Sequence, residues 1–325
     1  MTDLILALDQ GTTSSRSILF TEKAEIFAVA SEPLECHYPD SGWVEQDAEA
    51  IWETQRSTIV KVLDQAGIGL SEGSAMGITN QRESTIAWNR ETGEVLCPAI
   101  NWQCRRTAGF CDELKEEGFD ELIRNRTGLV TDPYFSGTKM HWILQNVPEA
   151  ANLARQGKLC FGTVDSWLIW KLSGGKTHAI EISNASRTLV FDIQRCEWDS
   201  EILARFGIPP ESLPEVVHSR GVIAEVDESQ FGGSAPIAGA AGDQQAALFG
   251  QACFSPGMAK NTYGTGCFMI SNTGKHLIRS QNGLLTTIGW KLGDEVTYAL
   301  EGSVFIAGAL VQWLRDGLEL SLIHI

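Results

Sequence analysis

The first 66 residues constrain the fold most, because three short apolar segments precede one amphipathic segment of helical periodicity. The apolar segments are residues 4–8, 16–20 and 26–30, and the turn Gln10-Gly11-Thr12-Thr13 separates the first two. Short apolar runs bounded by turn residues predict strands, here a β-meander. Asp47 is then expected to cap a helix. The inward-facing residues of this helix recur at steps of three and four: Ile51, Trp52, Gln55, Ile59, Val62 and Leu63. A meander followed by such a helix predicts the α/β class.

The rest of the chain continues this alternation of strands and helices. Residues 75–79, 85–88 and 159–161 predict strands, and Asp165 is expected to cap a helix. Residues 236–240 predict a strand that leads into a helix at 246–249. Five tryptophans lie at spacings typical of helix cores: Trp52, Trp142, Trp167, Trp170 and Trp313.

The second half of the chain repeats part of this plan. Residues 259–262 and 268–271 flank the tight turn Gly264-Thr265-Gly266, much as the opening strands flank theirs. This similarity between the two hairpins predicts a duplicated α/β unit rather than a solenoid. The length of 325 residues also favours two domains, at roughly 150 residues each. We expect the boundary near 249–256, which gives the domains 1–250 and 251–325.

The composition excludes several classes of protein. With 25 Lys+Arg against 41 Asp+Glu, the formal net charge is −16. This charge argues against non-specific binding to nucleic acid and to anionic membranes. The apolar run 304–311 is shorter than the ~18 residues of a membrane span, and no signal peptide is predicted at the N-terminus. Eight scattered cysteines without a C-x-x-C pair favour reduced thiols and a cytoplasmic location over zinc or disulfides.

The opening turn, Asp9-Gln10-Gly11-Thr12-Thr13-Ser14-Ser15-Arg16, is a candidate phosphate-binding loop. Its glycine lets backbone N–H groups converge on an anion, and the hydroxyls add donors. Arg16 supplies positive charge, and Asp9 could hold a metal-bound water. An ordinary hairpin is the alternative, because glycine and threonine are common in turns. The second glycine–hydroxyl turn, at 264–266, favours phosphate, because a triphosphate in a cleft can be bound from both sides.

Asp243 follows a predicted apolar strand and the small residues Ala240-Ala241-Gly242. Small neighbours let a ligand approach closely, and carboxylates at strand ends face clefts in α/β sheets. Asp243 is therefore a candidate general base that accepts a hydroxyl proton during attack on phosphorus. A helix N-cap is the alternative, and spacing alone favours the cap.

Arg82 and Glu83 follow the predicted strand 75–79. An adjacent donor and acceptor suit the hydroxyls of a polyol, whereas the alternative is a surface ion pair of about 0–1 kcal/mol. Tyr134 could donate its hydroxyl to a substrate, or pack with its tip in water. Trp102 has polar neighbours that suit the wall of a pocket.

Taken together, these motifs resemble the FGGY family of sugar and polyol kinases, and within it the members that phosphorylate glycerol. The resemblance runs from Leu4 to about Arg315. It rests on the strings A-L-D-Q-G-T-T-S-S-R, G-I-T-N-Q-R-E, W-Q-C-R-R-T, T-G-L-V-T-D-P-Y-F-S-G-T-K, F-G-T-V-D-S-W-L-I-W-K, A-G-D-Q-Q-A-A-L-F-G-Q and G-M-A-K-N-T-Y-G-T-G-C-F-M. It implies two ribonuclease-H-like domains, as in actin and the heat-shock ATPases, with ATP and substrate in the cleft between them.

The resemblance also implies roles for the matching residues. The nucleotide phosphates would contact Thr12, Thr13, Ser14 and Arg16, with Thr265 on the opposite loop and Gly308 and Gln312 nearer the nucleotide. The hydroxyls of glycerol would contact Arg82, Glu83, Tyr134, Asp243 and Gln244, and its carbons would contact Trp102 and Phe268. Asp243 would be the base, in preference to the cap role, and Asp9 would help to hold Mg²⁺ through water. The implied reaction is ATP-dependent phosphorylation of glycerol to sn-glycerol 3-phosphate, by a dimer or tetramer at full length.

Two features depart from the family pattern. Family members continue well beyond residue 325, and the last residues, 321–325, match nothing in the family, so we expect a truncated chain with an incomplete second domain. Residues 231–236 are shorter than the loop with which some bacterial members bind fructose 1,6-bisphosphate, so that regulation is not expected. Three rival hypotheses stay open: a kinase for another polyol or ketose, a nucleotide-driven hydrolase or chaperone of the same fold, and an inactive fragment.

Overall fold

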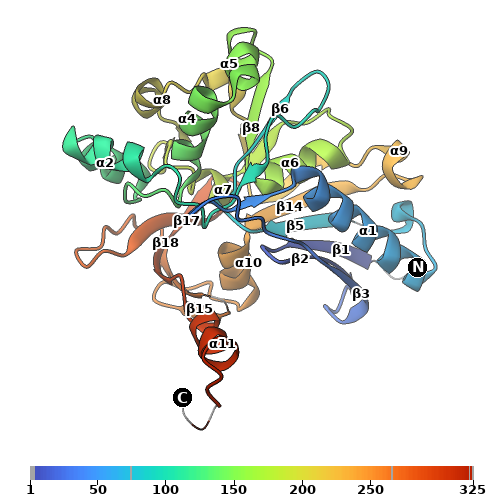
Figure 1. Cartoon of the computed structure of the whole chain (residues 1–325). Coiled ribbons are helices and arrows are strands. Elements are labelled where there is room, and N and C mark those ends of the chain that lie inside the picture. Colours follow the sequence, from blue (N-terminus) through green and yellow to red (C-terminus); the bar gives the residue numbers. More distant parts are fainter. Residues whose placement is uncertain (1–3, 74, 265, 322, 324–325) are drawn as a thin grey trace.

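The computed structural model describes residues 4–73, 75–264, 266–321 and 323. Its largest sheet has six strands in the order β13-β14-β5-β1-β2-β3 (Figure 1). The strands β1 (Leu4–Gln10), β2 (Ser14–Thr21) and β3 (Ile26–Pro33) form the predicted antiparallel meander. On the other side of β1, β5 (Ala75–Asn80) and β14 (Pro236–Gly242) add in parallel, and β13 (Arg220–Glu225) pairs with β14 in antiparallel direction.

One face of this sheet is covered by α1 (Ala48–Ala66) and α6 (Val164–Leu172). The helix α1 begins at the predicted cap, because the Asp47 carboxylate accepts the backbone N–H groups of Glu49 and Ala50. It ends at Gly67, whose φ of 67° is a left-handed conformation that glycine adopts without strain. All of the predicted inward-facing residues of α1 are buried.

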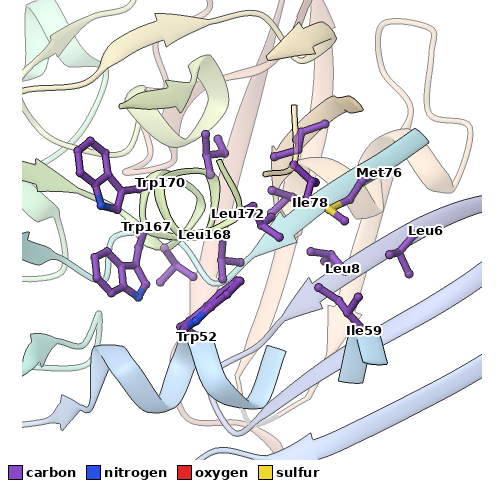
Figure 2. Packing of buried hydrophobic residues seen from close by; sticks show 14 of the residues in the cluster. Leu6, Leu8, Trp52, Ile59, Met76, Ile78, Trp167, Leu168, Trp170 and Leu172 are labelled. Atoms are coloured by element: carbon purple, nitrogen blue, oxygen red, sulfur yellow. The ribbon is translucent and has the colours of Figure 1, made fainter. Parts of the chain in front are cut away.

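The core between the sheet and these helices follows the period of two along each strand. Leu6 and Leu8 of β1 and Met76 and Ile78 of β5 are buried, and Figure 2 shows them on the side of the sheet that faces α1 and α6. Ile5 lies between two of the buried leucines in the sequence, points to the other face and is 44% exposed. The alternation therefore directs one set of side chains into the core.

A second sheet has four antiparallel strands in the order β15-β16-β18-β17. The strands β15 (Ala259–Tyr263) and β16 (Cys267–Gly274) form the predicted hairpin, and β17 (Leu285–Leu292) pairs with β18 (Glu295–Val304). The helix α10 (Asp243–Gly250) packs against strands of both sheets, and α11 (Gly308–Asp316) follows β18.

In the sequence, most of the remaining elements lie between β5 and β13. The helices are α2 (Ala108–Glu116), α3 (Asp120–Thr127), α4 (Ser136–Asn146), α5 (Pro148–Arg155), α7 (Ile182–Ala185), α8 (Ser200–Phe206) and α9 (Glu228–Phe231), with 3₁₀ turns at Leu70–Glu72 and Pro210–Ser212. Short strands form four two-stranded sheets: β4 (Glu45–Gln46) with β7 (Ala99–Ile100), β6 (Ile86–Asn89) with β8 (Leu159–Gly162), β9 (Ala179–Glu181) with β12 (Glu215–Val217), and β10 (Phe191–Asp192) with β11 (Glu197–Trp198).

Two expectations about local structure are wrong. The N-cap of α6 is Thr163, while Asp165 lies within the first turn and accepts the backbone N–H of Glu181. Trp313 lies on α11 and is 55% exposed rather than part of the core.

The described residues place limits on membrane and metal sites. No helix among them is both long enough and apolar enough to cross a bilayer. Within the same ranges, no group of three or more His, Cys, Asp or Glu side chains is arranged to hold a metal ion. Each of the eight cysteines is a free thiol.

Two buried carboxylates, those of Asp165 and Glu181, lie near the start of α7. Glu181 caps this helix by accepting the backbone N–H groups of Ser183 and Asn184. Burial raises the pKa of Glu181 to about 7 and that of Asp165 to about 6, although hydrogen bonds to both carboxylates oppose the shift. Each acid therefore holds its proton more tightly in the folded state than in the unfolded chain.

We expect the buried Glu181 to make the free energy of unfolding fall as the pH rises. Because its folded-state pKa lies above the ordinary 4.5, its contribution is present below pH 4.5 and is lost as the pH rises through about 7. In Glu181→Gln, whose amide resembles the protonated acid, this fall should shrink by about 2–3 kcal/mol. Urea unfolding across this pH range measures the change. Glu215→Gln, in the neighbouring strand β12, is the control and should keep the parent's slope. An unchanged slope in Glu181→Gln would show that folding does not raise the pKa of Glu181.

Leu8→Ala tests the assignment of the two faces of the first sheet. Leu8 is fully buried, so the substitution should lower the free energy of unfolding by about 2–5 kcal/mol, through lost apolar burial and a residual cavity. Ile5→Ala, on the same strand and 44% exposed, should cost less than about 1 kcal/mol. Denaturant titrations compare the two variants, and equal losses would contradict the assignment.

Candidate active site

The loops that follow three parallel strands meet at one edge of the first sheet. Gln10, Asn80 and Gly242 end β1, β5 and β14, and they are neighbours in the register of the sheet. The turn after β1, the segment after β5 and the start of α10 therefore lie together, at the edge where α/β sheets bind ligands. The turn between β15 and β16 of the second sheet contributes to the same place.

These loops surround a hollow of about 180 Å³. All of the residues predicted to contact the polyol line it: Arg82, Glu83, Trp102, Tyr134, Asp243, Gln244 and Phe268. The other lining residues come from the two glycine turns and their flanks, and from the residue before Arg82: Thr12, Gln81, Thr262, Gly264 and Gly266. The structure therefore brings the residues of the predicted polyol site together in one hollow.

The Arg82 side chain is 1% exposed and is surrounded by acceptors. Its Nε lies 3.3 Å from Asp243 Oδ1. Its two terminal nitrogens contact Glu301 in a bidentate pair, with Nη1–Oε2 at 2.6 Å and Nη2–Oε1 at 2.9 Å. Gly242 permits this arrangement, because a Cβ at that position would lie 2.7 Å from Arg82 Cδ. The interpretation of Arg82 and Glu83 as a surface ion pair is wrong, because both side chains are buried.

Glu83 is held in an uncommon backbone conformation, with φ of 63°. Its carbonyl oxygen accepts the Ser136 hydroxyl at 3.1 Å and the Lys139 ammonium group at 3.2 Å. Its carboxylate accepts Arg187 Nε at 2.7 Å. Burial raises the pKa of Glu83, against the lowering effect of Arg82 and Arg187. The surrounding donors fix both ends of this strained residue.

Aromatic side chains form one wall of the hollow. The Trp102 ring lies 5.7 Å from the Tyr134 ring and 6.2 Å from the Phe268 ring, each in an edge-to-face arrangement. Trp102 Nε1 donates to the Thr12 hydroxyl at 2.9 Å, which connects this wall to the first glycine turn. Tyr134 is 5% exposed, so the interpretation that places its tip in water is wrong. Burial raises the pKa of Tyr134, which therefore stays a hydrogen-bond donor.

Asp243 is the first residue of α10, and its side chain is 39% exposed toward the hollow that it lines. The N-cap of this helix is Gly242, so the assignment of Asp243 as the cap is wrong. Asp243 Oδ1 accepts the backbone N–H of Gln244 at 2.7 Å, and Oδ2 accepts Gln244 Nε2 at 3.1 Å. Together with Arg82, these donors orient the carboxylate.

The predicted phosphate-binding residues belong to the first glycine turn and the start of β2, and to the second glycine turn and α11. Thr12 lines the hollow, Thr13 and Arg16 are exposed and Ser14 is half-buried. Arg16 stands opposite Asp9 in the pairing of β1 with β2. In the second sheet, the backbone N–H of Gly308 donates to the carbonyl of Gly264 at 3.0 Å, so α11 begins beside the second glycine turn. Gln312 is exposed on α11, and Thr265 lies outside the described residues.

Sequence reasoning missed four buried charged residues that contact the predicted set: Lys139, Arg187, Lys260 and Glu301. Lys260 donates to Gln244 Oε1 and to the carbonyl of Phe268. Burial lowers the pKa of Lys139 to about 8. The sequence carries one signal for these residues: Glu301 directly follows the apolar run Tyr298-Ala299-Leu300. A charge in such a run indicates a buried partner.

Comparison with known proteins shows to which family this chain belongs. The model of the N-terminal domain of the FGGY family of carbohydrate kinases matches residues 4–250, and that of the C-terminal domain matches residues 259–322. The glycerol kinase of Carboxydothermus hydrogenoformans is 58% identical over 97% of the chain, and that of Bacillus subtilis is 54% identical over 98%. The chain spans only 63% and 65% of the lengths of these relatives.

Solved structures agree with this result. The glycerol kinase of Plasmodium falciparum, crystallised with ADP, matches with a TM-score of 0.92 and 34% identity, over 98% of this chain and 64% of that one. The xylulose kinase of Lactobacillus acidophilus matches with a TM-score of 0.85 and 20% identity, over 97% and 63% of the two chains, which is a likeness of fold alone. With its α/β, ribonuclease-H-like architecture, the chain belongs to the FGGY family of carbohydrate kinases.

Proposed function

We propose that this chain carries the polyol and phosphate sites of an ATP-dependent kinase that converts glycerol to sn-glycerol 3-phosphate. The observation that carries the proposal is the hollow in which Arg82, Asp243 and Tyr134 meet, with Arg82 Nε 3.3 Å from Asp243 Oδ1. The similar glycerol kinases of Carboxydothermus hydrogenoformans and Bacillus subtilis support the choice of substrate.

The groups around the hollow match the hydroxyls of a small triol. Arg82 and Tyr134 supply donors, the carboxylate of Glu83 supplies an acceptor, and the amide of Gln244 supplies both. The carbon atoms would pack against Trp102 and Phe268, which line the same hollow. A site that uses hydrogen-bonding groups on several hydroxyls rejects analogues that lack one, because a buried polar group is then left unpaired.

Asp243 is the proposed general base. Its carboxylate lines the hollow and is oriented by Arg82 and Gln244, so it can accept the proton of a substrate hydroxyl as that oxygen attacks the γ-phosphorus. In phosphoryl transfer, most of the catalysis comes from positioning and charge stabilisation rather than from covalent chemistry. The edge-on aromatic wall also limits the access of water to the transferred group.

The nucleotide phosphates would lie between the two glycine turns at the mouth of the hollow. Thr12, Thr13, Ser14 and Arg16 would bind them from the first sheet, and Thr265 from the second. Gly308 and Gln312, on α11, would lie nearer the rest of the nucleotide. Charge-assisted hydrogen bonds are about twice as strong as neutral ones, so a few such donors offset the desolvation of a triphosphate.

Asp9 suits a hydrated Mg²⁺ ion. Burial raises the pKa of Asp9, Arg16 lowers it and the nearby Asp243 raises it, so a cation would relieve the repulsion between the two carboxylates. Since Mg²⁺ keeps several waters and is held by one or two carboxylates plus substrate phosphates, no dedicated protein cage is needed. When bound, the ion would neutralise negative charge on the transferred phosphate.

The proposal extends to the organisation of the protein. Residues 1–250 would form the domain with the polyol and phosphate sites, and residues 251–325 would begin the nucleotide-binding domain. We also propose a dimer or tetramer in the cytoplasm, and light scattering on the purified protein measures that state directly.

We predict that glycerol stimulates ADP release. The assay couples ADP to NADH oxidation, and it compares this chain with an extended chain that adds the C-terminal part of the Bacillus subtilis glycerol kinase that this chain does not span. Stimulation of the extended chain by glycerol, above xylulose and gluconate at equal concentration, is the expected result. A larger response to xylulose or gluconate would favour another polyol or ketose kinase.

The same assay shows whether the chain is instead a hydrolase, a chaperone or an inactive fragment. ADP release that is independent of any polyol would indicate a hydrolase or chaperone. A response of the extended chain alone would show that this chain carries the site but needs the rest of the family's length for turnover. No response of either protein to glycerol would refute the proposed function.

Asp243→Asn tests the role of the base in the extended chain. The amide keeps the shape but cannot accept the proton, so kcat should fall by at least about 100-fold. Glycerol should still raise the thermal midpoint of the variant, because the other contacts to the hydroxyls are intact. Asp112→Asn, exposed on α2, is the matched control and should retain the parent's kcat. A kcat within about twofold of the parent in Asp243→Asn would contradict the role of the base.

A further inference from the structure

Four charged side chains form a closed group, of which two members line the hollow. We call Arg82, Glu83, Arg187 and Glu301 the charge ring. Their side chains are at most 1% exposed. The ring holds two positive and two negative charges, so it is neutral as a whole. Glu301 and Arg187 are not among the residues predicted to contact the polyol, and the sequence motifs assign no role to either.

The distances show that each member of the ring contacts two others. Arg187 Nε donates to Glu83 Oε1 at 2.7 Å, and Arg187 Nη2 donates to Glu301 Oε1 at 3.0 Å. Glu301 accepts both terminal nitrogens of Arg82, at 2.6 and 2.9 Å. Arg82 Nε lies 3.7 Å from Glu83 Oε1, which closes the ring. Glu301 thus contacts the two arginines, and Arg187 contacts the two glutamates.

The ring joins parts of the chain that belong to different sheets. Arg82 and Glu83 follow β5 of the first sheet, Arg187 follows α7, and Glu301 lies on β18 of the second sheet. Glu301 accepts both terminal nitrogens of Arg82, Gln245 Oε1 also accepts Nη1 at 3.1 Å, and the remaining Nε lies 3.3 Å from Asp243 Oδ1. A residue of the other sheet therefore holds both terminal nitrogens of Arg82, together with Gln245 of α10.

The composition of the ring favours a role in positioning over one in stability. Replacing a buried ion pair with apolar residues of similar volume is often neutral or stabilising, so such a pair is weak evidence for stability. Arg187 Nη1 is buried and has no hydrogen-bond partner within the described ranges, so the guanidinium makes its hydrogen bonds there through Nε and Nη2, to Glu83 and Glu301. Glu83 is also held with φ of 63°, which is a conformation that needs support from its surroundings.

We propose that Glu301 and Arg187 are positioning residues of the polyol site, which orient Arg82 and Glu83 for the substrate hydroxyls from across the two sheets. The inference rests on the function proposed above. It implies that the second sheet contributes to recognition of the polyol as well as to the nucleotide side. Changes to Glu301 or Arg187 should therefore alter the KM for glycerol without altering the KM for ATP.

Kinetics of the extended chain test this inference. Glu301→Gln keeps the shape of the side chain but removes the charge that orients Arg82, so the KM for glycerol should rise at least about tenfold. The KM for ATP should stay within about twofold, because the glycine turns are untouched. Glu295→Gln is the matched control, since Glu295 lies on the same strand and pairs only at the surface, with Lys275, at 70% exposure. It should leave both constants unchanged.

A second variant covers the case in which Glu301→Gln does not fold. Arg187→Lys keeps the charge, but a lysine has no planar fork with which to contact Glu83 and Glu301 together, so it should show the same selective rise in the KM for glycerol. The double variant combines Arg187→Gln with Glu301→Gln. Its increase in the KM for glycerol should be smaller than the product of the increases in the two single variants, because both residues act through the charge ring.

The outcomes distinguish this inference from the proposed function. If the parent responds to glycerol and both Glu301→Gln and Arg187→Lys keep its KM for glycerol, the positioning role is wrong while the function stands. A drop in thermal midpoint with unchanged KM would show a role in stability alone, and would also overturn the inference. If the parent itself shows no glycerol-dependent turnover, the function and the inference both fail.

Discussion

The parallel pairing of β1, β5 and β14 is the constraint on which the candidate site depends. Because the three strands run in the same direction, their ends place the turn after Gln10, the segment after Asn80 and the start of α10 at a single edge. Side chains alternate along a strand, so a slip of one residue in β14 would turn its end to the wrong face. Gly242 adds a second condition, because only a residue without a Cβ leaves room for the Arg82 side chain.

Elements that depend on local signals could be predicted from the sequence. The meander, the helix capped by Asp47 and the hairpin around residues 264–266 follow from periodicity and turn residues, and each is present. The cap of α6 is harder to predict, because Thr163 and Asp165 are both good capping types two positions apart. What decides between them is a contact that is remote in the sequence, the hydrogen bond from Glu181 to Asp165.

The part of the site that could not be predicted consists of charges whose partners are distant in the sequence. Arg82 and Glu301 are separated by 219 positions, and Arg187 and Glu83 by 104. A local pattern treats a lone charge as solvent-exposed, because an unpaired buried charge is costly. The packing of the second sheet against the first supplies Glu301 as a partner of Arg82, and the segment after α7 supplies Arg187 as a partner of Glu83. Arg82, Glu83 and Asp243, which the motifs did identify, follow the ends of β5 and β14, where position in the sequence indicates position in the hollow.

The two ends of the site differ in how firmly their side chains are held. At the proposed polyol end, buried donors fix Glu83 at a strained φ, and Arg82 is surrounded by acceptors. Burial of Glu301 is outweighed by Arg187 and Arg82, which lower its pKa to about 2. At the proposed phosphate end, Thr13, Arg16 and Gln312 are exposed. A preorganised site loses little conformational entropy on binding and discriminates by geometry, whereas an exposed one can adapt as a ligand enters. In the proposed function, selectivity therefore depends on the buried half of the site. Buried charge and backbone strain are tolerated there because residues of both sheets hold the group in place.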